Sequence, residues 1–135
     1  MFTIDDLIKA TGGHFIQGPE DARVKSVSID SRVVQKGDLF IAVKGDIFDG
    51  HDFIKEVIVK GVQVVIVHKP IAISNPKVSA IMVKDTTKAL GDLARFHRLR
   101  FKIPVIALTG SAGKTTTKEM VASVLNKKFR VLKNE

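Results

Sequence analysis

Cysteine, tryptophan and tyrosine are all missing from this sequence of 135 residues. Without cysteine, the chain has no disulfides, no thiolate zinc ligands and no cysteine nucleophile. Its four histidines are scattered and never stand at the close spacing of metal ligands, which argues against a histidine metal site. All eight aromatic residues are phenylalanine, and no basic patch alternates with them, so the sequence has no stacking platform for single-stranded nucleic acid.

Long hydrophobic runs are missing too. No apolar run approaches the ~20 residues of a membrane-spanning helix. The N-terminal segment MFTIDDLIKA carries acidic residues where a signal peptide carries basic ones. Hydrophobic residues make up 44% and charged residues 27% of the chain, which is ordinary for a globular protein. We therefore expect a soluble cytoplasmic protein with one domain, or with one domain and part of another.

Basic residues outnumber acidic ones, because 22 Lys and Arg stand against 14 Asp and Glu and give a net charge of +8. Such an excess favours anionic partners, namely nucleic acid, anionic lipid or phosphorylated small molecules. A solvated basic surface explains it equally well. The bases are spread along the chain, with denser stretches at 88–102 and 127–133. Charge alone therefore gives only weak support to nucleic-acid binding.

Strand-like and helix-like segments alternate along the chain, which predicts an α/β fold with a largely parallel sheet. Thr3 and Asp6 have the spacing of a capping box for a first helix, which the glycines at 12–13 should end. Further helices are expected at 51–60, from 86 to about 101, and at 114–127. Strands are expected at 24–29, 38–43, 62–67, 79–83, 103–108 and 129–132.

The most informative segment is the phosphate loop, residues 109–117, with the sequence TGSAGKTTT. It lies between an apolar strand and an amphipathic helix, as such a loop requires. Glycines let backbone N–H groups approach phosphate oxygens, and the helix points its positive end at the same anion. Lys114 would contact the β- and γ-phosphates, and the Thr115 hydroxyl would ligate Mg²⁺. The general pattern G-x-x-x-x-G-K-[ST] has glycine where this chain has Leu108, so the loop is a shorter G-x-x-G-K-T-T.

Two separate blocks carry a resemblance to a known family. The segment TGSAGKTTTKE at 109–119 resembles the ATP loop of the Mur ligases, cytoplasmic bacterial enzymes that build the peptide of the cell-wall precursor. DSR at 30–32, GDLFIA at 37–42, Gly45 and DGHDFI at 49–54 resemble their UDP-sugar-binding domain. The resemblance covers the whole chain. DGHDF and TTTKEM are most similar to the branch that adds D-alanyl-D-alanine to UDP-N-acetylmuramoyl-tripeptide.

The resemblance implies three domains: a UDP-substrate domain, a central ATPase domain and a C-terminal domain. It implies a UDP-substrate domain at 1–84, a linking helix at 85–102, and the first strand–loop–helix–strand of a parallel-sheet ATPase domain at 103–135. The rest of that sheet, an acidic Mg²⁺ ligand, a modified lysine and the C-terminal domain are not in the sequence. We therefore expect an incomplete fragment that cannot complete the reaction alone. Its orphaned strands should expose apolar surface and favour self-association.

By the same resemblance, ATP phosphorylates the substrate carboxylate, and the amine of D-alanyl-D-alanine attacks the acyl phosphate. The products are an amide, ADP and phosphate. Lys114, which would stabilise the transferred phosphoryl group, and Thr115, the Mg²⁺ ligand, are the catalytic candidates. The nucleotide-binding candidates are Gly110, Ser111, Ala112, Gly113, Lys114, Thr115 and Thr116. The substrate-binding candidates are Ile29 and Ser31 at the uridine end, the adjacent Arg32, and Asp46, Ile47 and Phe48 in a loop expected to close around it.

Several of these residues have structural alternatives, and so does the function. Ile29 and Phe48 could serve core packing, Ser31 and Arg32 could form a turn with the aspartate before them, and the DGH motif fits a turn and a helix cap better than a ligand set. The runner-up ligase adds the third amino acid of the peptide. A folate polyglutamylation enzyme fits less well, because its loop lies near the chain start. A basic nucleotide- or nucleic-acid-binding module without catalysis is the non-enzymatic alternative.

Overall fold

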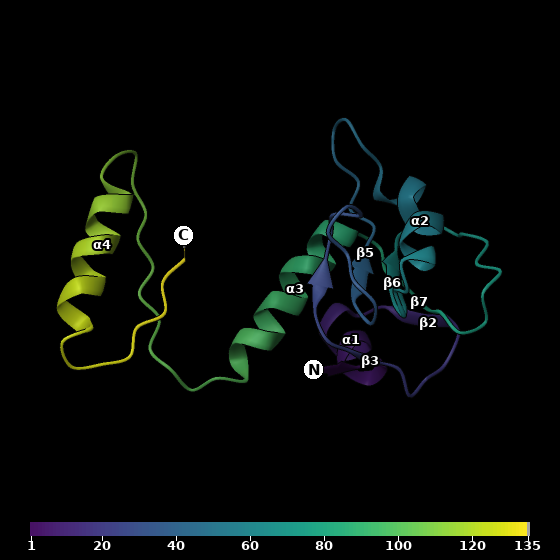
Figure 1. Ribbon diagram of the computed structural model, residues 1–135, viewed down its shortest axis with the longest axis horizontal. Coiled ribbons are helices and arrows are strands. Elements are labelled where there is room, and N and C mark those ends of the chain that lie inside the picture. The colour runs from purple at the N-terminus through teal and green to yellow at the C-terminus, as the bar shows by residue number, and fades with distance from the viewer. Residues whose placement is uncertain (135) are drawn as a thin grey trace. The chain divides into compact units, whose positions relative to one another are not determined.

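The computed structural model describes residues 1–134 and confirms the α/β class. The chain forms two compact units, Met1–Phe101 and a second unit that begins at Lys102. The first unit contains a layered sheet with helices, and the second contains one helix with long connecting segments (Figure 1). Within the described residues, no helix is long and apolar enough to cross a lipid bilayer.

A five-stranded sheet forms the centre of the first unit, in the order β2-β7-β6-β5-β4. The four strands from β4 to β7 are parallel, and β2 pairs antiparallel with β7 at one edge. A two-stranded antiparallel pair, β1 with β3, lies in a separate small sheet. The strand bounds are β1 Phe2–Thr3, β2 His14–Gln17, β3 Arg23–Val24, β4 Val27–Ser28, β5 Leu39–Ile41, β6 Val64–Val67 and β7 Ser79–Met82.

Helices cover both faces of this sheet. Along β6, Val64 and Ile66 belong to a hydrophobic cluster with residues of α1 (Ile4–Thr11) and α3 (Thr86–Leu99). Val65 and Val67 belong to a second cluster with residues of α2 (Ile54–Val59). All four β6 side chains are fully buried. The continuous apolar run in β6 is therefore explained by burial on both faces, which is typical of a central parallel strand.

The helix starts follow the local sequence signals. Thr3 and Asp6 form the expected capping box, with their side chains accepting from each other's backbone N–H at 3.2 and 3.1 Å. Gly12 ends α1 with a left-handed φ of +65°. The segment expected as one helix at 51–60 is instead a short 3₁₀ turn, η1 (Gly50–Phe53), followed directly by α2.

The edge strand β2 was not expected from the sequence. Its four residues alternate between exposed and half-buried, so they lack the run of buried apolar side chains that marks a central strand. Gly18 lies just beyond it, where a Cβ would come within 2.4 Å of the Val78 carbonyl oxygen. Glycine at this position therefore lets the chain approach β7 closely.

The helix expected to link the two blocks is part of the first unit. Ala89 and Leu93 of α3 are buried in the same cluster as residues of α1. Near its end, Arg100 lies 5.3 Å from the Phe2 ring centroid and pairs with Asp6 at 3.2 Å. Because these contacts hold α3 against α1, the compact first unit extends to Phe101, and the boundary of the UDP-substrate domain at residue 84 stays a prediction.

The strands expected at 103–108 and 129–132 are not formed. Both segments lack regular structure, and α4 (Lys114–Leu125) is the one regular element described in the second unit. A strand requires a partner for its N–H and C=O groups, and neither segment pairs with another strand here. Val105 and Ile106 are 61% and 60% exposed. The expected exposure of apolar surface is therefore confirmed, and self-association stays a prediction.

Candidate functional site

The substrate-binding candidates lie where two neighbouring parallel strands end. β4 is followed by Ile29, Ser31 and Arg32, and β5 is followed by the loop that contains Asp46 to Phe48. The two strands pair in parallel register, with Ser28 opposite Phe40. Open α/β sheets bind ligands at the carboxyl ends of such strands. The topology therefore brings both groups of candidates to one edge of the sheet.

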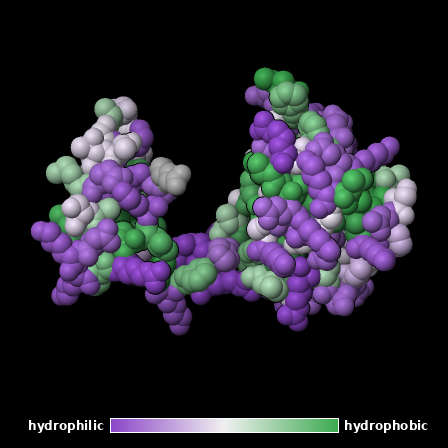
Figure 2. Space-filling model, viewed as in Figure 1, coloured by the Kyte–Doolittle hydropathy of each residue, from purple (hydrophilic) through white to green (hydrophobic). Residues whose placement is uncertain are grey.

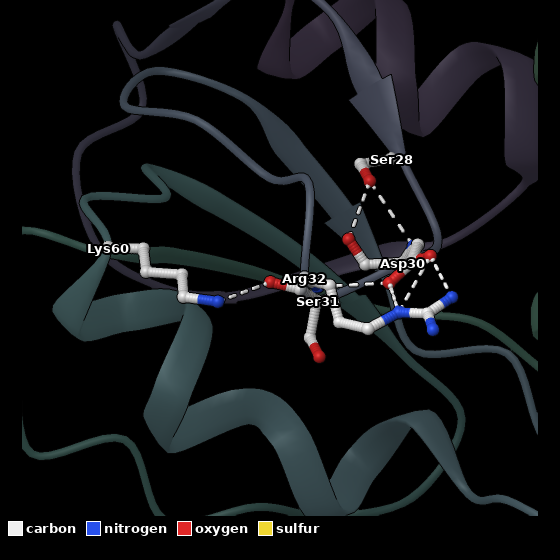
Figure 3. Close-up of polar contacts among 5 residues, drawn as sticks. All are labelled: Ser28, Asp30, Ser31, Arg32 and Lys60. Carbon is white, nitrogen blue, oxygen red and sulfur yellow. Dashed lines mark hydrogen bonds and ion pairs between the residues drawn. The ribbon is translucent and has the colours of Figure 1, made fainter.

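Arg32 is held in a tight turn by Asp30 (Figure 3). The Arg32 backbone N–H donates to Asp30 Oδ1 at 2.9 Å, and its guanidinium donates to both carboxylate oxygens, with Nη2 at 2.6 Å from Oδ2. This guanidinium lowers the pKa of Asp30 to about 2. The Arg32 side chain is 84% exposed, so the turn leaves it accessible from solvent.

Ser31 is buried and anchored through its main chain (Figure 3). Its carbonyl oxygen accepts a hydrogen bond from Lys60 Nζ at 2.7 Å, and the same ammonium pairs with Glu56 at 2.6 Å. The residue is 8% exposed. Among residues 1–134, its hydroxyl has no hydrogen-bond partner, although buried hydroxyls usually have one. Ser31 is thus a fixed residue whose hydroxyl is available to a ligand.

The loop between β5 and η1 presents apolar side chains to solvent. Ile47 is 86% exposed and Phe48 is 69% exposed, and Figure 2 shows hydrophobic surface at the tip of this loop. Ile29, beyond the end of β4, is 52% exposed. These exposures rule out core packing for Ile29 and Phe48. The loop is closed at its base by a hydrogen bond from Gly50 N–H to the Val43 carbonyl at 2.9 Å.

The interpretation of the DGH motif as a turn and helix cap is confirmed. Asp49 Oδ1 accepts from the His51 backbone N–H at 2.9 Å and lies 2.6 Å from His51 Nδ1. Lys69 Nζ donates to the other Asp49 oxygen at 2.6 Å, and this contact, with the His51 amide, holds the Asp49 pKa well below its usual value. The His68 backbone N–H donates to His51 Nε2 at 3.2 Å. His51 Nδ1 is therefore the nitrogen that carries the proton in this network.

His51 makes the stability of the first unit depend on pH. Its side chain is 2% exposed, and burial lowers its pKa from the usual 6.5. Below pH 6.5 the His51 imidazole is protonated in the unfolded chain but binds a proton less readily in the folded chain. The free energy of unfolding should therefore fall as pH drops from 7 to 5, by at most about 1.4 kcal/mol per pH unit. The depressed pKa of Asp49 adds a further loss below about pH 4.

Urea denaturation at pH 7, 6 and 5 measures this dependence. The His51→Asn variant should lose most of the slope between pH 7 and 5, because asparagine does not titrate. His14, which is exposed on β2, supplies the control: His14→Asn should keep the slope. A slope that is the same in the wild type and in His51→Asn would contradict the assignment of this pH dependence to His51.

The phosphate loop turns into α4 as expected. Gly110 and Gly113 have positive φ angles of +153° and +76°, and Gly113 is the residue before the first helical turn. All loop residues are exposed. Lys114 Nζ donates to the Gly110 carbonyl at 2.5 Å, so the ammonium lies over the loop and not in an apolar interior. An anion can therefore reach both the ammonium and the loop amides.

The start of α4 differs from the starts of the other long helices. The side chain of Thr3 caps α1, and that of Asp85 caps α3. No side chain caps α4, whose first turn also contains no acidic residue. The first N–H groups of a helix need partners, and here they are left for an external acceptor. This is the arrangement expected of a phosphate-binding helix start.

The fit of Mg²⁺ depends on one hydroxyl. Thr115 is exposed in the first turn of α4, directly after Lys114. Mg²⁺ in nucleotide sites takes few protein ligands and keeps phosphate oxygens and waters, so a single threonine hydroxyl fits this role. Within residues 1–134, no group of three His, Asp or Glu side chains is placed to hold a metal ion.

Sequence reasoning missed a pocket at the same edge of the sheet. His68 follows β6 and Lys84 follows β7, and both line an open pocket of about 280 Å³ together with Lys44. Each of the two residues is the first polar residue after an apolar strand. That position was the available signal, but only the parallel pairing of β5, β6 and β7 brings the three residues together.

The fold and the loop define an α/β protein with a glycine-rich phosphate loop. The sequence model of the protein family described as "Mur ligase family, catalytic domain" matches residues 23–98, which is more than half of the chain. The chain belongs to the Mur ligase family. The matched residues lie within the first unit, so this match is independent of the phosphate loop.

Known relatives cover most of the chain. It is 42% identical over 107 residues to a UDP-N-acetylmuramoyl-tripeptide–D-alanyl-D-alanine ligase of Synechocystis, an alignment that covers 79% of this chain and 24% of the relative. It is 43% identical over 105 residues to a UDP-N-acetylmuramoyl-L-alanyl-D-glutamate–2,6-diaminopimelate ligase of Aquifex aeolicus, covering 76% and 21%. The chain thus spans about a quarter of the length of these relatives.

Solved structures of Mur ligases are also similar to this chain. A crystal structure of MurF from Acinetobacter baumannii matches 94% of this chain and 28% of its own, with a TM-score of 0.85 and 42% identity. A MurF ligase from Thermotoga maritima, solved in complex with ADP, matches 83% of this chain and 26% of its own, with a TM-score of 0.74 and 37% identity. At 42% and 37% identity, the chain is similar to these structures in sequence as well as in fold.

Proposed function

We propose that this chain contributes the UDP-substrate unit and the ATP loop of a ligase that adds D-alanyl-D-alanine to UDP-N-acetylmuramoyl-tripeptide in peptidoglycan-precursor synthesis. The observation that carries the proposal is the start of α4, which leaves its amides uncapped behind a glycine loop with Lys114. The names of the similar proteins from Synechocystis and Acinetobacter baumannii support the choice of reaction.

On the substrate side, the residues at the ends of β4 and β5 bind the UDP-linked substrate. The Ser31 hydroxyl donates or accepts a hydrogen bond at the uridine end, because it has no partner in the described chain. Ile29, Ile47 and Phe48 supply exposed apolar surface on which a base can rest. Arg32 and Asp46 are charged residues at the same edge and complete the candidate set.

On the nucleotide side, the backbone from Gly110 to Thr116 holds the phosphates of ATP. Lys114 exchanges its bond to the Gly110 carbonyl for the β- and γ-phosphates, and it stabilises charge on the phosphoryl group that moves to the substrate carboxylate. Thr115 would hold Mg²⁺, which would neutralise charge on the phosphates. The ADP in the related Thermotoga maritima structure supports ATP as the nucleotide. We place the reaction in the cytoplasm, where its ATP is found.

A second ligase remains a candidate because the chain is equally similar to a 2,6-diaminopimelate ligase. That enzyme would add the third amino acid of the peptide and would accept a shorter UDP-linked substrate. Binding of UDP-N-acetylmuramoyl-dipeptide in preference to the tripeptide would favour it. A non-catalytic basic module would instead bind DNA with a steep dependence on salt concentration.

Calorimetric titration of the chain with UDP-N-acetylmuramoyl-tripeptide tests the proposal. Ser31→Ala should weaken binding about 5–10-fold, the equivalent of one lost hydrogen bond of ~1 to 1.5 kcal/mol. Ser74 is exposed in a loop of the same unit, and Ser74→Ala should leave the affinity unchanged. The proposal is wrong if the chain binds no UDP-linked compound, or if it binds DNA with a steep salt dependence and Ser31→Ala has no effect on UDP compounds.

A further inference from the structure

The polar pocket lined by Lys44, His68 and Lys84 opens at the carboxyl ends of the parallel strands, as do the loops with the substrate candidates. It lies at the carboxyl ends of β6 and β7 and at the start of α3, within the first unit, and its volume is about 280 Å³. The residues that line it come from three separate connections, after β5, β6 and β7. They are Lys44, His68, Lys84, Asp85, Thr86 and Thr87.

The two lysines of this pocket are not neutralised. Within residues 1–134, neither Lys44 nor Lys84 takes part in an ion pair, whereas nearby Lys69 and Lys88 pair with Asp49 and Asp92. The one carboxylate in the lining belongs to Asp85. Two unpaired cations against one carboxylate leave the pocket positively charged. Such a pocket attracts an anion.

A buried hydroxyl in the same pocket lacks a partner. Thr86 is 3% exposed, and no residue of the described chain forms a hydrogen bond with its hydroxyl. No fully enclosed side-chain oxygen or nitrogen in the described residues is left unpaired, so the Thr86 oxygen must keep some access to open space. The open space that Thr86 lines is the pocket. A buried hydroxyl that keeps this access is suited to bond a ligand.

The pocket does not depend on the dipole of α3. Asp85 Oδ1 already accepts the backbone N–H groups of Thr87 and Lys88, at 2.7 and 2.9 Å. The donors for a ligand are therefore side chains: two ammonium groups, the Thr86 hydroxyl and the His68 imidazole. The His68 ring contacts His51 edge-on at 4.3 Å between centroids, and in the described chain its nitrogens form no hydrogen bond.

We propose that this pocket binds a phosphate group. Several donors that converge from different loops fit the many acceptor oxygens of a phosphate better than a single carboxylate. Its source is the diphosphate of the UDP-linked substrate or a free phosphate, and the first of these rests on the proposed function. β4 and β7 are three strand spacings apart, about 14 Å. A nucleotide whose base lies at the β4–β5 end would extend its phosphates along the edge toward this pocket.

Titrations with inorganic pyrophosphate, UDP and uridine test the proposal. They are made with the Lys114→Ala variant, so that the phosphate loop contributes as little as possible to the measured binding. The double variant Lys44→Gln/Lys84→Gln should bind pyrophosphate at least tenfold more weakly. The control Lys55→Gln/Lys77→Gln removes two exposed, unpaired lysines elsewhere in the first unit and should change the affinity less than twofold. Circular dichroism confirms that each variant is folded.

The pattern across the three probes identifies the source. If the pocket variant loses affinity for pyrophosphate and UDP but not for uridine, the pocket binds the diphosphate of the nucleotide. If it loses pyrophosphate alone, the pocket binds free phosphate. Equal pyrophosphate binding by the pocket variant and the control overturns the inference, and it leaves the proposed function standing if UDP still binds. Lysine-dependent pyrophosphate binding without any UDP binding supports the pocket and contradicts the proposed function.

Discussion

Lys114→Ala is expected to weaken Mg·ATP binding by at least about tenfold while UDP-compound binding stays unchanged. The ammonium lies over the phosphate loop, 2.5 Å from the Gly110 carbonyl, where it can contact the terminal phosphates. A hydrogen bond to a charged group contributes about 1.5–3 kcal/mol, so the affinity should fall by at least about tenfold. The UDP-substrate candidates lie in the other compact unit, so they should be unaffected. Calorimetry with Mg·ATP and, separately, with UDP measures both effects.

A matched control tests whether the loss of ATP affinity depends on the position of the Lys114 charge or only on the net charge of the chain. Lys127 is exposed just after α4, and Lys127→Ala removes one positive charge without touching the loop. It should keep Mg·ATP affinity within about twofold, since exposed charges at a distance are screened. Loss of ATP and UDP binding together in Lys114→Ala would show that the two sites are not separate. Unchanged ATP binding in that variant would contradict the role of the loop.

Phe40→Ala should destabilise the first unit by about 3–5 kcal/mol. Phe40 is 1% exposed on the interior strand β5 and packs in the hydrophobic cluster between the sheet and α2. Removing its ring leaves a cavity that rigid neighbouring strands cannot fill. Since small domains have a stability of roughly 5–15 kcal/mol, the loss would be a large part of the total. Urea denaturation followed by circular dichroism measures the change in the free energy of unfolding.

Phe48 provides the matched control, because it is the same residue type on the exposed loop after β5. At 69% exposure, Phe48→Ala should change the free energy of unfolding by less than about 0.5 kcal/mol. It should nevertheless weaken binding of UDP-linked compounds if Phe48 contacts the substrate, as we propose for this exposed ring. Equal destabilisation by the two substitutions would mean that the loop packs as core.

Much of the first unit could be predicted from short stretches of sequence. The capping box of Thr3 and Asp6, the glycine that ends α1 and the apolar run of β6 all appear where their patterns indicate. Two predicted strands, 103–108 and 129–132, have the right composition but no partner, and they do not form. The short edge strand β2 forms although its sequence pattern is weak, because β7 supplies the pairing.

The candidate sites also contain some features that the sequence predicts and others that it does not. The phosphate loop is contiguous, so its glycines, Lys114 and Thr115 could be read directly as one unit. The exposure of Ile29 and Phe48 could not, since an apolar residue next to a strand is buried or exposed according to what packs against it after folding. The convergence of Lys44 and Lys84 could not be predicted either, because the 39 residues between them must fold before the two loops meet.

The sequence by itself determined the features that depend on residues a few positions apart: helix starts, the turn at Asp30 and Arg32, and the glycine bend before α4. Such contacts form within one turn of chain, so residue type and spacing are enough to predict them. Only the tertiary structure decided which strands pair, which nitrogen of His51 is protonated, and which lysines face one pocket. Those outcomes depend on partners that are distant in sequence and adjacent only after folding.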